Sequence, residues 1–89
     1  MDILWDSAKS RKLKESRGIS LEDVAQIILE KRNLAILENP VRPKQRIFIV
    51  KYQGYTHVVP FVVDAGKNIV LKTIFPSRTF HKLYGEKKK

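Results

Sequence analysis

The chain contains no cysteine, so disulfide bonds and cysteine-ligated zinc sites are excluded, and the reducing cytoplasm is the expected location. Its two histidines are too few to predict a metal site. No run approaches the roughly 20 apolar residues of a membrane span, and the first residues lack the basic-then-apolar pattern of a signal peptide. We therefore expect a single cytoplasmic domain over residues 1–89, with no cofactor and no membrane partner.

Acidic residues are scarce in the second half of the chain. Residues 1–40 hold seven basic and seven acidic residues, whereas residues 41–89 hold eleven basic residues against Asp64 and Glu86. The whole net charge of +9 therefore lies in the C-terminal half. Three of these charges belong to a basic tail, residues 86–89, which we expect to be mobile. The remaining excess of +6 predicts a surface for a polyanionic partner, either nucleic acid or an acidic protein.

The region from Arg46 to Arg78 organises the chain as three strands joined by two turns. The strands are rich in β-branched and aromatic residues and cover Arg46–Tyr52, Tyr55–Val63 and Asn68–Phe75. Gln53-Gly54 predicts a two-residue hairpin turn, with glycine where a positive φ is needed. Tyr52 is therefore expected to pair with Tyr55.

The second loop decides which side chains share a face of the predicted sheet. A four-residue loop over Asp64–Lys67 pairs Val63 with Asn68. One face is then mostly aliphatic and is expected to pack on helices. The other face mixes aromatic and basic side chains and makes His57 and Lys72 diagonal neighbours. We expect a basic site on this second face.

Helices are expected before and after these strands. The first covers residues 8–17 and ends at Gly18, and the second runs from Ser20 to about Asn33 with an apolar stripe. Ser77 is the expected cap of a short C-terminal helix over residues 78–84. The resulting fold class is α+β: a small antiparallel sheet of three to four strands, with two N-terminal helices on one face and the short helix at the C-terminus.

Three shorter features complete the predicted fold. Residues 3–5 are an edge strand or a plug, and residues 34–38 form a short strand. The basic loop Val41–Gln45 contains proline and is expected near a ligand. Pro60 predicts a bulge or an edge in the second strand, because proline has no N–H for the ladder.

Two segments match a known pattern in order and spacing. Trp5-Asp6-x-x-Lys9 is followed by Arg17-Gly18-Ile19-Ser20-Leu21-Glu22-Asp23-Val24, and the chain closes with Leu71-Lys72-Thr73-Ile74-Phe75-Pro76-Ser77-Arg78 and then Tyr84. This arrangement resembles the BrnT-type toxins of type II toxin–antitoxin systems, which belong to the RelE-like superfamily. The chain departs from that pattern at Arg17, where histidine is common, and at Thr79-Phe80, which replaces a basic-alanine step.

The resemblance implies a RelE-like fold and a toxin that cleaves RNA without a metal ion and thereby inhibits translation. It implies RNA as the substrate, free or on the ribosome. It also implies a cognate antitoxin, a small protein with a DNA-binding domain, through which alone the toxin would contact promoter DNA.

Metal-independent RNA cleavage sets the chemistry that site residues must perform. The 2′-OH must lose a proton, the phosphorane must be stabilised by positive charge, and the 5′-oxygen must gain a proton. Lys72 and Arg78 suit the charge stabilisation, while His57, His81, a lysine or a tyrosine are available for proton transfer. The predicted catalytic residues are Arg78, Lys72, His57 and His81; the predicted RNA-binding residues are Arg46, Lys51, Tyr52, Tyr55, Lys82 and Tyr84.

Simpler structural roles compete with several of these assignments. His57 faces apolar residues and is equally typical of a core histidine, and a position on a short helix favours a bystander role for His81 over a catalytic one. Tyr52 and Tyr55 are typical of a cross-strand pair that stabilises a hairpin. Lys72 is harder to explain structurally, because lysine is depleted in strand interiors.

Two other function classes remain open. A non-catalytic module that binds RNA or an acidic protein is favoured by the lack of an evident general base. A toxin of the same fold acting on a protein target, such as a topoisomerase, is the other. RNA cleavage by the purified protein distinguishes an enzyme from the non-catalytic module. Inhibition of gyrase without loss of RNA indicates the toxin that acts on a protein.

Overall fold

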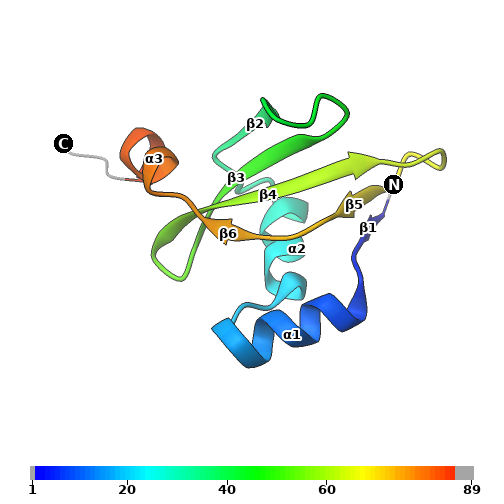
Figure 1. Cartoon of the computed structure of the whole chain (residues 1–89), viewed down its shortest axis with the longest axis horizontal. Coiled ribbons are helices and arrows are strands. Elements are labelled where there is room, and N and C mark those ends of the chain that lie inside the picture. Colours follow the sequence, from blue (N-terminus) through cyan, green and yellow to red (C-terminus); the bar gives the residue numbers. More distant parts are fainter. Residues whose placement is uncertain (1, 86–89) are drawn as a thin grey trace.

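A six-stranded sheet forms the centre of the α+β fold, with α2 on one side and the C-terminal helical segment on the other (Figure 1). The structure is a computed structural model and describes residues 2–85. The elements are β1 (Ile3–Leu4), α1 (Ser7–Arg17), α2 (Leu21–Leu29), β2 (Ala35–Glu38), β3 (Arg46–Tyr52), β4 (Tyr55–Val63), β5 (Ile69–Leu71), β6 (Phe75–Pro76), α3 (Arg78–Phe80) and η1, a π-helical turn (His81–Gly85). The strand order is β1-β5-β4-β3-β2, and β6 also pairs with β4.

The sheet differs from the expected one in strand count and in direction. It has six strands instead of three to four, because the expected third strand is divided into β5 and β6 and because the chain start adds β1. β1 pairs with β5 in parallel, which makes the sheet mixed and not purely antiparallel. The edge strand expected in residues 3–5 and the short strand expected in residues 34–38 are confirmed as β1 and β2.

The first hairpin forms as the sequence predicts. Gln53 and Gly54 both have positive φ, 54° and 78°, which defines a type I′ turn. This turn matches the right-handed twist of the flanking strands, and it pairs Tyr52 with Tyr55.

The second hairpin contains one more residue than expected. Lys67 adopts a left-handed φ of 64°, while the Asp64 N–H donates to the Asn68 carbonyl at 3.0 Å. Asp64 and Asn68 close a three-residue loop, residues 65–67, with Lys67 as the bulge. Five residues, not four, therefore lie between paired strand residues, and Val63 pairs with Ile69 and not with Asn68. Because side chains alternate along a strand, the one-residue slip moves the side chains of residues 69–72 to the other face.

The assignment of helices to the faces was also wrong. α2 packs on the face that carries Phe48, Val50, Val59 and Phe61, here called the α2 face. The aliphatic face, with Ile47, Ile49 and Val58, instead packs against Phe80 and Tyr84 and is here called the α3 face. Aromatic rings on the α2 face fill the core beneath the helix; Phe48 and Phe61 stack with centroids 4.2 Å apart.

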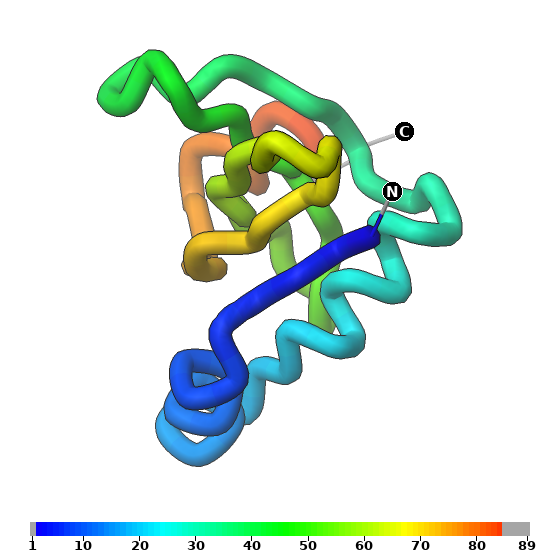
Figure 2. The backbone as a smooth tube through the Cα atoms, turned by 90° about the vertical axis from the view of Figure 1, so that its right-hand side faces the viewer, coloured from blue at the N-terminus to red at the C-terminus, as the bar shows by residue number. Residues whose placement is uncertain are grey.

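Of the two N-terminal helices expected on one face, α2 covers the sheet and α1 only borders the same core through Leu13. α1 is capped by Asp6, whose carboxylate accepts the Ala8 N–H at 2.8 Å, and it ends at Gly18 in the left-handed region, as predicted. The sequence of α1 has little apolar surface, and none of its residues is fully buried. In Figures 1 and 2, α1 lies at the lower edge of the molecule, whereas α2 lies against the sheet.

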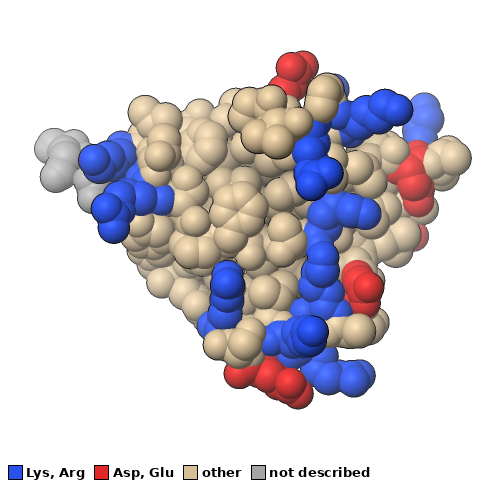
Figure 3. All heavy atoms as spheres, in the orientation of Figure 1, with Lys and Arg blue, Asp and Glu red and all other residues tan. Residues whose placement is uncertain are grey.

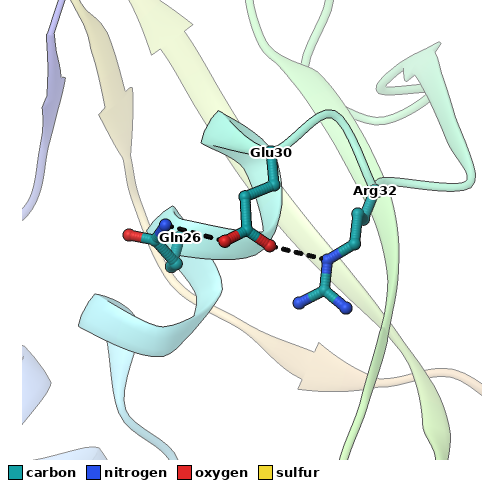
Figure 4. A network of polar contacts seen from close by, with 3 residues as sticks. All are labelled: Gln26, Glu30 and Arg32. Atoms are coloured by element: carbon teal, nitrogen blue, oxygen red, sulfur yellow. Dashed lines mark hydrogen bonds and ion pairs between the residues drawn. The ribbon is translucent and has the colours of Figure 1, made fainter.

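α2 begins and ends with defined hydrogen bonds. Ser20 caps it by accepting the Asp23 N–H at 3.4 Å. At its C-terminus Lys31 takes a φ of 58°, and the Arg32 N–H reaches the Ile27 carbonyl at 3.0 Å, a Schellman motif. The helix thus ends before Asn33. Glu30 links the side chains of Gln26 and Arg32 there (Figure 4).

The C-terminal helical segment begins where the sequence predicts. Ser77 caps α3 by accepting the Phe80 N–H at 3.3 Å, and η1 continues it to Gly85. The basic tail lies outside the described residues. Within residues 2–85, no helix combines the length and the apolar character needed to cross a membrane.

Candidate nucleic-acid interface

Pro60 interrupts the hydrogen-bond ladder between β4 and the segment after β5. Facing residues at this position should exchange two backbone bonds, and the Lys72 N–H does donate to the Pro60 carbonyl at 2.8 Å. Proline has no N–H to return, so the Lys72 carbonyl accepts instead from the Lys9 ammonium at 2.9 Å. Lys9 therefore ties α1 to the sheet by replacing a missing ladder bond.

The bulge or edge predicted at Pro60 is not found in β4, which is an inner strand; an extra residue lies instead in the facing segment. Between the pairs Val62–Val70 and Val58–Phe75, β4 advances by four residues while its partner advances by five. The extra residue separates β5 from β6 and lets Ile74 enter the core, where it is 1% exposed. Pro60 itself stays inside β4, paired with Ile47 of β3.

The loop between β2 and β3 is held by its own side chains. Asn39 Oδ1 accepts the N–H groups of Val41 and Arg42, at 2.9 and 3.2 Å. The Gln45 N–H donates to the Arg42 carbonyl at 2.9 Å, and the Asn39 N–H donates to the Gln45 carbonyl at 3.2 Å. These bonds fix the Arg42 backbone and leave its side chain on the surface.

A groove of about 490 Å³ lies between this loop, α1 and the segment that joins β5 to β6. We call it the basic groove; its lining residues are Lys9, Asn39, Val41, Arg42, Gln45, Pro60, Lys72, Thr73 and Phe75. Three of them are cationic and none is acidic, so the groove carries a local positive potential that attracts an anion. Figure 3 shows Lys and Arg side chains gathered in a column on the right of this face.

A second group of basic side chains lies at the α3 end, on the left of Figure 3, with uncharged surface between the two groups. Arg78 opens α3 and Lys82 lies in η1; both are exposed. Lys72 faces the same side of the sheet as α3, because its backbone partner Pro60 lies two residues from Val58 in β4 and so shares its face. Lys72 and Arg78 thus share a side of the sheet but belong to separate basic groups.

Four aromatic rings meet around the Gln53-Gly54 turn, and we call them the hairpin cluster: Tyr52, Tyr55, His57 and His81. The ring of His81 stacks on Tyr55 with centroids 4.1 Å apart, and His57 meets Tyr52 and Tyr55 edge-on at 5.7 and 6.2 Å. The cluster places both histidines at the end of the sheet away from the basic groove.

The two histidines have different surroundings within this cluster. His57 is 6% exposed on the α2 face, and its Nδ1 lies 3.0 Å from the Tyr55 carbonyl. His81 is half-buried, and its Nδ1 accepts the Thr56 N–H at 3.3 Å and lies 2.9 Å from Thr56 Oγ1. Since that nitrogen accepts a hydrogen bond, proton exchange between neutral His81 and a substrate would have to use Nε2.

The predicted proximity of His57 to Lys72 is wrong. His57 pairs with Pro76 and lies on the α2 face, whereas Lys72 lies on the α3 face. The one-residue slip in the second hairpin is the cause, because it exchanged the faces of residues 69–72, while the extra residue before β6 returns Ile74 and Phe75 to the expected faces.

The predicted RNA-binding residues occupy several places. Tyr52 is 7% exposed, and its hydroxyl accepts the Ser20 N–H at 3.0 Å and approaches Asp23 Oδ2 at 3.4 Å, so it joins the hairpin to α2. Lys51 is exposed and pairs with Thr56, near His81.

The remaining two, Tyr84 and Arg46, lie on different elements, η1 and β3. Tyr84 is half-buried beside Phe80, with ring centroids 6.2 Å apart, over the α3 face. Arg46 begins β3 and lines a separate hollow with Lys44, Phe61, Val62 and Val63. The structure therefore does not collect all the predicted residues at one place.

Sequence reasoning did not assign Lys9, Asn39 or Arg42 to the site. Two signals pointed to this region: the basic loop Val41–Gln45, and Pro60, whose missing N–H requires another donor for the facing carbonyl. Spacing along the chain does not reveal that a lysine of α1 is that donor.

No family model, curated protein or solved structure matches the chain. Membership of the BrnT-type toxins therefore stays a prediction from sequence resemblance. Within residues 2–85, no three His, Cys, Asp or Glu side chains are grouped so that they could hold a metal ion.

Proposed function

We propose that the protein is the toxin of a type II toxin–antitoxin pair, a RelE-like, BrnT-type endoribonuclease that acts in the cytoplasm without a metal ion. The observation that carries the proposal is the uneven charge of the two halves of the chain. The net charge of +9 comes from residues 41–89, and Lys72, Arg78 and Arg42 place part of it on the side of the sheet that α2 leaves open. A polyanion such as RNA suits this surface better than an uncharged substrate.

The proposed chemistry rests on Lys72 and Arg78. Positive charge close to the scissile phosphate stabilises the phosphorane as negative charge develops on its oxygens. Arg78 offers a guanidinium that can grip two phosphate oxygens at once, and Lys72 offers a point charge. Because the two belong to separate basic groups, Arg78, near His81 in the chain, would contact the scissile phosphate, and Lys72 would hold the same RNA strand at a second phosphate.

A cognate antitoxin is part of the same proposal. An excess of positive charge in the C-terminal half of a small domain suits an acidic protein segment that covers it and excludes RNA. Contact with promoter DNA would then run only through the antitoxin.

Binding of RNA without cleavage is a second candidate, and the state of the histidines favours it. His57 is buried, and His81 Nδ1 accepts the Thr56 N–H. A binding module needs the basic surface and no proton transfer.

Incubation of the purified protein with RNA, with and without ribosomes and in the presence of a chelator, separates the two candidates. We expect cleavage in chelator, strongly reduced in Arg78→Ala and in Lys72→Ala with an unchanged thermal transition. Lys31→Ala, which removes an exposed charge at the end of α2, is the matched control and should cleave normally. Cleavage at the wild-type rate in both site variants would end the catalytic assignment, and binding without cleavage would favour the second candidate.

A further inference from the structure

We infer that the basic groove binds single-stranded RNA, with phosphates on Lys9, Arg42 and Lys72 and a base against Phe75. The inference deepens the proposed function, since it takes RNA as the ligand and assigns the groove as the place where it binds. It requires no cleavage, and so it can hold for a catalytic or a non-catalytic protein.

The first argument is the charge and the fixed position of the three cations. The Lys9 ammonium is held 2.9 Å from the Lys72 carbonyl, and the Lys72 backbone is held in turn by Pro60. Arg42 stands on a loop closed by Asn39. Cations whose supports are already ordered lose less conformational freedom when they bind an anion.

The second argument is that the groove is not uniformly polar. Phe75 is 41% exposed and Val41 is 81% exposed, and both line the groove beside the three cations. An exposed aromatic side chain within a basic groove is the arrangement that binds single-stranded nucleic acid, because bases stack on aromatic rings while the backbone follows the charge. A paired duplex hides the faces of its bases, so an unpaired strand fits this lining better than a helix.

The third argument is that the charged side chains are available. Arg42 and Lys72 are exposed, and both contribute to the fold through backbone bonds, which a change of side chain preserves. Lys9 has two roles, because the ammonium that lines the groove also supplies the bond to Lys72. The charge of the groove is therefore best tested at Arg42 and Lys72.

The test measures binding of a fluorescent 2′-O-methylated single-stranded RNA by anisotropy over a series of salt concentrations. This probe lacks the 2′-OH nucleophile, so cleavage does not interfere. The logarithm of the association constant should fall with the logarithm of the salt concentration by about 0.7 for each phosphate neutralised. Arg42→Gln and Lys72→Gln should each reduce that slope by about 0.7, whereas the matched control Lys31→Gln should leave it unchanged.

Phe75→Leu tests the base contact separately from the charge. Loss of the aromatic ring should weaken binding roughly fivefold or more at every salt concentration without changing the slope. A thermal transition recorded for each variant shows that it is folded at the temperature of the assay.

Several results would overturn the inference. Unchanged slopes in Arg42→Gln and Lys72→Gln would exclude the groove, and an equal effect of Lys31→Gln would indicate diffuse attraction. Equal binding of a duplex RNA or an acidic peptide, with no effect of Phe75→Leu, would exclude the base contact. Groove binding without cleavage of native RNA would contradict the proposed enzyme alone, whereas cleavage with unchanged slopes would contradict the groove alone.

Discussion

Replacement of Lys9 by methionine should destabilise the protein because it removes the donor that stands in for the missing N–H of Pro60. Methionine keeps the apolar stem of the side chain and loses the ammonium that donates to the Lys72 carbonyl at 2.9 Å. Hydrogen bonds to a charged partner contribute about 1.5–3 kcal/mol. Both groups lie at the surface, where water replaces part of the bond, so we expect a loss of about 1 kcal/mol.

The size of this effect is measurable in a domain of 89 residues. A loss of about 1 kcal/mol lowers the thermal midpoint of such a domain by roughly 4–8 °C. In urea, with a slope of about 1–3 kcal/mol/M, the midpoint should fall by several tenths of a molar unit or more. Lys12→Met, on the exposed surface of the same helix, is the matched control and should stay within about 0.5 kcal/mol of the wild type.

A double-mutant cycle with Pro60→Ala tests the cause directly. Alanine supplies the N–H that proline lacks, so the Lys72 carbonyl regains its ladder donor and no longer depends on Lys9. In the Pro60→Ala background, Lys9→Met should therefore cost little, with a coupling energy of about 0.5–1 kcal/mol. If Lys9→Met lowers the free energy of unfolding equally in both backgrounds, Lys9 does not replace the missing ladder bond. If Lys9→Met leaves the wild-type stability unchanged, the Lys9 bond does not stabilise the fold.

Three further predictions concern single positions. Lys67→Gly should raise the free energy of unfolding by about 1 kcal/mol. Lys67 has a φ of 64°, a conformation that costs a residue with a Cβ about 1–2 kcal/mol. Unchanged stability in urea would contradict that strain. Tyr52→Phe should lower the free energy of unfolding by about 1 kcal/mol, because it removes the hydroxyl that accepts the Ser20 N–H. RNA binding measured by anisotropy should stay the same, and weakened binding would instead make Tyr52 a binding residue. The N–H of Asn68 lowers the pKa of Asp64, so its contribution to stability is complete above the unfolded value of about 3.9 and is lost as the pH falls through the lower folded pKa. Urea midpoints measured from pH 5 downwards should therefore fall less steeply in Asp64→Asn, and parallel curves would exclude Asp64 as a contributor.

Local sequence signals predicted most of the secondary structure because the responsible residues act on their immediate neighbours. Gly18 ends α1 with a left-handed φ, and Ser20 and Ser77 cap the helices that follow them. Gly54 fixes the first hairpin and its register. Each of these depends on a backbone conformation or a hydrogen bond within a few residues of the signal.

The second hairpin shows where such reasoning fails. Asp64–Lys67 contains a glycine, yet Gly66 is not the residue with positive φ; Lys67 takes that conformation. Nothing in the sequence marks lysine for a left-handed position, so the added residue was not foreseen. One residue then reversed the faces of residues 69–72 and separated Lys72 from His57.

The sequence predicted only part of the candidate site, because its cations come from segments that are far apart in the chain. Lys72 was singled out because a lysine is unusual in a strand, and it does line the basic groove. Its neighbours Lys9 and Arg42 come from α1 and from a loop, and only tertiary structure brings them together. The charge asymmetry predicted that an anion-binding surface exists, but the sequence does not specify which cations form it.

The most direct test of the RNA-binding surface is a map of backbone amide chemical shifts as a short 2′-O-methylated single-stranded RNA is added to the isotope-labelled protein. The surface proposed here predicts that the amides of Arg42, Lys72 and Phe75 shift with RNA concentration, together with those at the start of α1. Shifts confined to the far end of α2, or no shifts at RNA concentrations that saturate binding in the anisotropy assay, would contradict it.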